Sequence, residues 1–138
     1  MKRKIQSALT LTVAALLAAC GGGGGTSPSA NTVNLTGSAA KGILIGADVS
    51  AHEVVNGQMA TKALATVKTG ADGSYTLAIA PTSNPVVIKV TAGAGTKMKD
   101  ESQVNGDGSF VEVTLTAPLE MRSFVSAATE SVSAQITP

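Results

Sequence analysis

From Thr32 onward, apolar and polar residues alternate with a period of two along one short segment after another. A β-strand places successive side chains on opposite faces, so each of these segments presents one apolar face. Tyr75, Leu77 and Ile79 form the clearest such face. No segment of this region sustains the period of an amphipathic helix. The pattern predicts an all-β domain over residues 32–138.

Turn-forming residues divide the alternation into about eight short strands. Asn56-Gly57 predicts a two-residue hairpin turn, because both positions tolerate a positive φ. The sequence Gly70-Ala71-Asp72-Gly73 predicts another turn. Short antiparallel strands that each carry one apolar face are buried when two sheets pack face to face. We therefore expect a two-sheet antiparallel β-sandwich.

Two further expectations concern the core and the loops. Val, Ile, Leu and Ala dominate the apolar faces, and the chain contains one Tyr, two Phe and no Trp. We expect the three aromatic residues, Tyr75, Phe110 and Phe124, to lie mostly in the core. The stretch from Lys97 to Gly108 is polar and rich in turn-forming residues, so we expect it to be a mobile loop.

The N-terminus has a different composition. Residues 2–4 are Lys-Arg-Lys, and an apolar run follows from Ile5 to Leu16. The run is shorter than the roughly 20 residues that a spanning helix needs. A cationic start, a short apolar run and small residues at its end are typical of a signal peptide. We expect residues 1–19 to be a helical signal peptide that is removed.

The end of this segment, Leu17-Ala18-Ala19-Cys20, resembles the lipobox of bacterial lipoproteins. The resemblance implies that the Cys20 thiol takes a diacylglycerol, that the bond before Cys20 is cut, and that the new amine is acylated. Cys20 is the only cysteine and has no internal disulfide partner, which favours lipidation. An ordinary secretory signal and a transmembrane anchor are the alternatives. The following Gly21 resembles the pattern for outer-membrane sorting, so we expect an envelope location, anchored by lipid at the outer membrane.

Residues 20–31 are mostly Gly, Ser and other small residues, which predicts a flexible, disordered tether. Its five consecutive glycines lack the Lys-Ser/Thr pair and the preceding strand of a phosphate-binding loop. Without residues 1–19 the chain keeps seven Lys and Arg against nine Asp and Glu, a net charge of about −2. No basic patch remains, and we expect no nucleic-acid partner.

Three segments of the domain resemble the carboxypeptidase-regulatory-like modules: Gly37–Gly42, Ile45–Val49 and Gly70–Leu77. Those modules share a prealbumin-like, Ig-like sandwich with the B-type repeats of collagen adhesins. The resemblance implies a non-catalytic spacer, folding aid or adhesive surface. Related adhesin repeats often carry a Lys-to-Asn isopeptide bond promoted by a buried Glu. No Glu lies near Ala80-Pro81, so we expect no such bond from Lys41.

Candidate catalytic residues are few. His52 is the only histidine, and Ser50 shares its strand face. Side chains two positions apart on a strand are separated by about 7 Å, beyond hydrogen-bond reach, so we expect an exposed histidine with no catalytic role. Asp48 and Glu53 fall on opposite faces of the strand, and we interpret them as solvated charges. We expect no catalytic residues and no cofactor.

Metal-binding patterns are incomplete as well. Asn105, Asp107 and Gly108 match positions 3, 5 and 6 of a calcium loop. Gln103 and Thr114 stand where the first Asp and the last Glu of that loop are needed, so we expect a turn. A calcium site that uses Asp100 or Glu101 is the alternative reading. One His and one modified Cys cannot form a zinc site.

The sequence therefore predicts a lipid-anchored envelope protein with a non-catalytic β-sandwich. Its partner is the membrane, through the lipid on Cys20, and the sequence identifies no protein or glycan ligand. One alternative is the accessory N-terminal domain of a larger exported enzyme. Pro118–Arg122 followed by Ser131–Pro138 resembles the closing strand of such a module in longer lipoproteins, where the chain continues into another domain. Another is an adhesin domain that binds through the stretch from Gly93 to Gly108. Whether the module is free-standing or truncated stays open.

Overall fold

The computed structural model describes residues 31–138. The predictions for the signal peptide, Cys20 and most of the tether lie outside these residues. The described region is all-β, with eleven strands and no helix. The strands are β1 (Val33–Ser38), β2 (Ile43–Ile45), β3 (Asp48–Val55), β4 (Gln58–Met59), β5 (Ala65–Lys68), β6 (Ser74–Ile79), β7 (Val86–Ala92), β8 (Lys97–Val104), β9 (Phe110–Thr114), β10 (Leu119–Val125) and β11 (Val132–Ser133).

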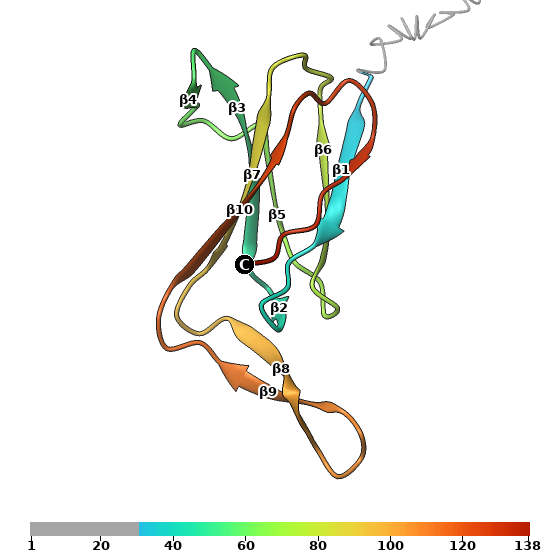
Figure 1. Cartoon of the computed structure of the whole chain (residues 1–138), viewed down its shortest axis with the longest axis vertical. Coiled ribbons are helices and arrows are strands. Elements are labelled where there is room, and N and C mark those ends of the chain that lie inside the picture. The colour runs from blue at the N-terminus through green and yellow to red at the C-terminus, as the bar shows by residue number, and fades with distance from the viewer. Residues whose placement is uncertain (1–30) are drawn as a thin grey trace, which may run out of the picture.

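The strands form three sheets. One has the order β11-β1-β6, and a second has the order β10-β7-β3-β4 with β5 also paired to β3. These two sheets lie side by side as layers, and the third sheet, β2-β8-β9, extends from one end of them (Figure 1). The all-β prediction is confirmed, and the layers are consistent with a β-sandwich. The count exceeds the prediction mainly because β2, β4 and β11 have only two or three residues each.

One strand pair departs from the expected antiparallel arrangement. β11 runs parallel to β1, with Leu35 opposite Val132. After β10 the chain crosses from one layer to the other at the end where β1 begins, so it then runs alongside β1 in the same direction (Figure 1). The other paired strands of the described region are antiparallel.

The core lies between the first two sheets. Leu35 and Leu77 from one sheet and Val49 and Ile88 from the other are fully buried. The alternation in β6 is confirmed, because its Tyr75, Leu77 and Ile79 are buried while the intervening residues are exposed. Burial of these aliphatic side chains supplies the main stabilising free energy of the domain.

The expectation that all three aromatic residues lie mostly in the core is wrong for two of them. Phe124 is 62% exposed and Phe110 is 38% exposed. Phe124 falls between the buried Met121 and Val125 on the alternation of β10, and therefore points away from the core. Phe110 begins β9, which belongs to the third sheet outside the two layers.

The prediction of a loop from Lys97 to Gly108 is wrong for residues 97–104. Residues 97–104 form β8, which pairs with β9, and a turn closed by the bond from Asn105 N–H to Ser109 O, 2.7 Å, joins the two strands. The register shifts between Asp100 and Val104. Because β8 is largely exposed, it does not need a regular apolar face, so its sequence lacks the alternation that identifies buried strands.

The predicted turns are confirmed where the structure describes them. Asn56 and Gly57 have φ values of 52° and 75° between β3 and β4. Gly73, in the turn before β6, has a φ of 76°. Both turns therefore use the left-handed region that Asn and Gly tolerate.

Tyr75 fixes the end of the chain onto β1. Its hydroxyl donates a hydrogen bond to the carbonyl of Ala134. The same segment is held by a bond from Ala134 N–H to Thr36 O, 2.7 Å, and by one from Ile136 N–H to Ser38 O, 3.0 Å. Burial raises the pKa of Tyr75 to about 12.

This shift predicts the alkaline behaviour of the domain. The folded state favours the neutral phenol, so the stability that Tyr75 contributes is complete below its ordinary pKa of about 10 and is lost as the pH rises toward 12. Tyr75 is the only tyrosine and there is no tryptophan, so ultraviolet absorbance of the phenolate reports this group alone. We expect a midpoint near 12 in the native protein and near 10 in denaturant. A native midpoint near 10 would contradict the burial of this hydroxyl.

Candidate functional site

The strand β3 is buried on both faces. Ala51 and Val49 face the core, and on the opposite face Ser50 is 8% exposed and His52 is 6% exposed. Between β4 and β5 the chain leaves its pairing with β3 after Ala60 and returns at Leu64, whose N–H donates to Ala51 O at 2.8 Å. Residues 61–63 form a bulge directly after Ala60, whose carbonyl oxygen contacts His52.

The histidine is held by hydrogen bonds at both ring nitrogens. Nδ1 lies 2.8 Å from the carbonyl oxygen of Ala60, and Nε2 lies 3.0 Å from the hydroxyl oxygen of Ser50. The predictions of an exposed histidine and of a Ser50 hydroxyl beyond reach are therefore wrong. The spacing of about 7 Å applies to the backbone of the two residues, and the long imidazole side chain spans it.

This arrangement has the bonding order of a nucleophile and its base. The Ala60 carbonyl can only accept, so Nδ1 carries the hydrogen and Nε2 accepts the proton of Ser50. Attack on a substrate also needs an accessible nucleophile and donors for the developing oxyanion. The Ser50 residue is more than nine-tenths buried, so its hydroxyl is not accessible to a substrate. It serves as a hydrogen-bond partner of His52. We interpret the pair as a structural hydrogen-bond chain that attaches the bulge to β3.

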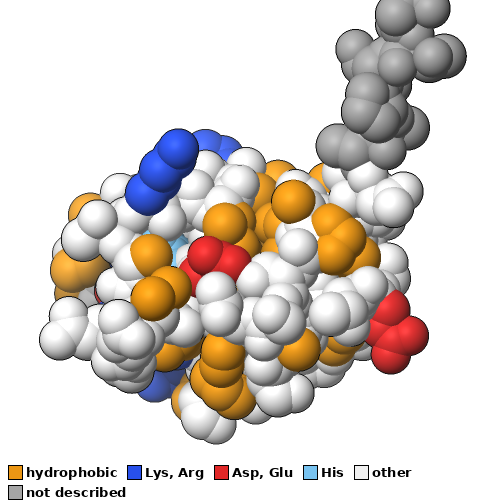
Figure 2. Space-filling view, turned by 90° about the horizontal axis from the view of Figure 1, so that it is seen from above, with side chains coloured by type: hydrophobic (Ala, Val, Ile, Leu, Met, Phe, Trp, Pro, Cys, Tyr) orange, Lys and Arg blue, Asp and Glu red, His pale blue; other side chains and the backbone are white. Residues whose placement is uncertain are grey.

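The burial of His52 can also be seen from outside, at the end of the sandwich where β1 begins. Figure 2 looks at this end, where hydrophobic side chains are interspersed with polar ones, and only a small part of the single histidine is visible between its neighbours. A hollow of about 300 Å³ lies at the bulge and is lined by Glu53, Lys62 and Leu64, among others.

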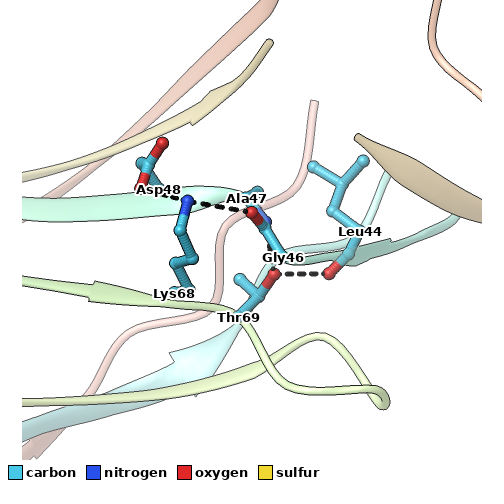
Figure 3. Close-up of polar contacts among 6 residues, drawn as sticks. All are labelled: Leu44, Gly46, Ala47, Asp48, Lys68 and Thr69. Carbon is cyan, nitrogen blue, oxygen red and sulfur yellow. Dashed lines mark hydrogen bonds and ion pairs between the residues drawn. The ribbon is translucent and has the colours of Figure 1, made fainter. Parts of the chain in front are cut away.

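The two carboxylates considered in the sequence have separate partners. Asp48 Oδ1 pairs with Lys68 Nζ at 2.7 Å on the surface (Figure 3). Glu53 Oε1 accepts a hydrogen bond from the Thr82 hydroxyl at 2.5 Å. Asp48 is exposed, whereas Glu53 is half-buried, so the interpretation as solvated charges describes only Asp48. The two groups do not form a common site.

Three aspartates form the same local turn. Each accepts hydrogen bonds from the backbone N–H and the hydroxyl of the serine two residues later, and these bonds hold the pKa of each carboxyl below its usual value. The pairs are Asp72 with Ser74, Asp100 with Ser102, and Asp107 with Ser109. Two of the carboxylates considered for calcium, Asp100 and Asp107, thus serve turns of the backbone. Residues 31–138 contain no group of three or more His, Cys, Asp or Glu that could hold a metal ion.

Sequence reasoning missed a buried polar contact that is made by Thr69. Its hydroxyl donates to Leu44 O at 2.7 Å and accepts from Ala47 N–H at 3.0 Å (Figure 3). These bonds close the backbone between β2 and β3, where Gly46 has a φ of 74°. A threonine directly after a strand gives no signal of this contact, because the acceptor lies 25 positions away in the chain. Thr69 therefore has a structural role.

Larger hollows lie elsewhere. One of about 580 Å³ separates the end of β10 from residues 132–135. Another of about 500 Å³ lies on the β8–β9 hairpin, beside Phe110, Lys99 and Glu112.

Lys41, considered for an isopeptide bond, is exposed in the turn before β2. Among residues 31–138, no helix has the length and hydropathy required to cross a membrane.

Family models, curated proteins and solved structures were compared with this chain, and none matched. The lipoprotein resemblance and the resemblance to carboxypeptidase-regulatory-like modules therefore stay predictions from the sequence. The predicted modification site, Leu17-Ala18-Ala19-Cys20, lies outside the described residues.

Proposed function

We propose that this chain is a bacterial envelope lipoprotein, anchored through lipid on Cys20, whose domain is a non-catalytic structural, spacer or binding module with a prealbumin-like sandwich. The observation that carries the proposal is the single cysteine at the end of Leu17-Ala18-Ala19-Cys20, directly after a cationic start and a short apolar run. Acyl chains contribute about 0.8 kcal/mol per buried methylene, so several chains on one residue give stable anchoring.

The arrangement of the domain is compatible with this anchoring. The described chain begins next to β1 at one end of the sandwich, and the β8–β9 hairpin extends from the opposite end (Figure 1). A flexible linker over residues 20–31 has an end-to-end distance of about 20 Å. In the proposed orientation the hairpin is directed away from the membrane.

The hairpin is the part of the domain best placed to bind a ligand. Val104 is 59% exposed and Phe110 is 38% exposed near its tip, beside the hollow of about 500 Å³. Val104 lies opposite Phe110 in the ladder, so the two exposed apolar side chains are adjacent at the projecting tip. This position favours a binding role over that of a simple spacer.

Fractionation of a bacterial host that expresses the full chain tests the anchoring. We expect the protein in the membrane fraction after washes with high salt and alkali, and its release by detergent, because covalent acyl chains resist both washes. Incorporation of a labelled fatty acid into the same band identifies the anchor. Recovery of the unlabelled protein in the aqueous fraction would overturn the proposal.

A further inference from the structure

The strand β10 has an open edge. It pairs with β7 on one side, and among the described strands it is the longest with a partner on one side only. All seven of its residues pair with β7 in one continuous register, from Leu119 opposite Ala92 to Val125 opposite Val86. On its free side, alternate backbone N–H and C=O groups are available to another strand.

The sequence of β10 lacks the usual protection of an edge strand. Proteins commonly block such edges with charged side chains, above all lysine, with proline or with a β-bulge. β10 has no proline, no lysine and no register shift. Its two charges neutralise each other within the strand, since Arg122 Nη2 lies 2.6 Å from Glu120 Oε1. The hollow of about 580 Å³ leaves space beside the end of the strand at Ser123, Phe124 and Val125.

The charges also determine which register two identical strands would adopt. In an antiparallel pair related by a two-fold axis at Met121, Glu120 of each copy lies opposite Arg122 of the other. An axis at Glu120 or at Arg122 instead places identical charges opposite each other. Opposite charges across strands stabilise a pair and like charges destabilise it. The strand is therefore self-complementary in the register centred on Met121.

We propose that β10 pairs with β10 of a second copy of this chain about a two-fold axis at Met121. The pairing joins the two β10-β7-β3 sheets into one continuous sheet. It forms two reciprocal pairs of Glu120 with Arg122 on the outer face. The exposed Phe124 lies on the same face and is partly covered by the second copy near Pro118. This is an isologous interface, in which both copies use the same surface.

The charges allow a test with two variants that each pair more weakly with themselves than the native strand does. Glu120→Arg gives a strand with two cations, and Arg122→Glu gives a strand with two anions. For the full-length protein in an excess of detergent micelles, light scattering is expected to show a dimer whose dissociation constant rises about tenfold or more in each variant. An equimolar mixture of the two variants is expected to form a heterodimer, although both have lost the ion pair within the strand.

A matched charge reversal on another edge strand is the control. Glu112→Arg in β9 breaks the exposed pair of Glu112 with Lys97, 3.2 Å, and is expected to leave the dimer unchanged. Circular dichroism verifies that each variant is folded. A monomer at every concentration would overturn the proposal. A dimer that is insensitive to both β10 variants would also overturn it, because the interface would then lie elsewhere.

Discussion

The substitution Gly37→Ala is expected to lower the free energy of unfolding by about 3 kcal/mol or more. Gly37 lies in β1 directly opposite Tyr75 of β6. A Cβ atom at this position would lie 2.0 Å from the carbonyl oxygen of Ala134 and 2.7 Å from the Tyr75 hydroxyl. The closest atom belongs to the backbone and cannot rotate away. The final segment must therefore move off β1, which weakens the Tyr75 hydrogen bond and exposes Ile136.

Thermal or urea unfolding followed by circular dichroism measures this loss. For a domain of this size we expect the melting temperature to fall by about 10 °C or more. Gly93→Ala is the matched control, because a Cβ there meets no atom within 4 Å, and its effect should stay within about 0.5 kcal/mol. Equal stability of the two variants would show that the final segment is not packed against β1.

The substitution Cys20→Ser is expected to abolish lipid attachment and processing. It replaces one sulfur with oxygen, and the hydroxyl cannot take the diacylglycerol that the lipobox resemblance implies for the thiol. Because cleavage follows that step, the variant should retain residues 1–19. We expect no incorporation of labelled fatty acid and a precursor that is longer at its N-terminus, measured by mass spectrometry.

A relocated thiol separates lipidation at this position from general reactivity of a lone cysteine. The double variant Cys20→Ser with Ser27→Cys keeps one thiol in the chain but moves it away from Leu17-Ala18-Ala19. It is expected to behave like Cys20→Ser alone. Fatty-acid labelling of the double variant would show that the tetrapeptide does not direct the modification.

The parts of the fold that the sequence predicts well are those where one strong physical rule acts alone. β6 alternates strictly because one of its faces is buried against the core, and Leu77 and Ile79 are buried as expected. The turn at Asn56-Gly57 follows from the backbone freedom of these two residues, which does not depend on distant contacts.

The features that the sequence did not predict depend on contacts between distant segments or on backbone pairing between solvent-exposed strands. β8 is stabilised by its backbone ladder with β9 and carries polar side chains, so it resembles a loop in composition. The hydrogen bond of His52 joins it to the Ala60 carbonyl eight positions away, which alternation within β3 cannot show. Phe124 follows the face alternation of β10, and its exposure contradicts only the general tendency of aromatic residues to be buried.

The mass of the N-terminal peptide of the protein purified from bacterial membranes tests the proposed anchoring most directly. We expect a peptide that begins at Cys20 and carries acyl chains on both the thiol and the α-amine. Because Cys20 is the only cysteine, the modified peptide is unambiguous. A peptide that begins at Met1, or one that begins after residue 19 with an unmodified thiol, would contradict the proposed lipid anchoring.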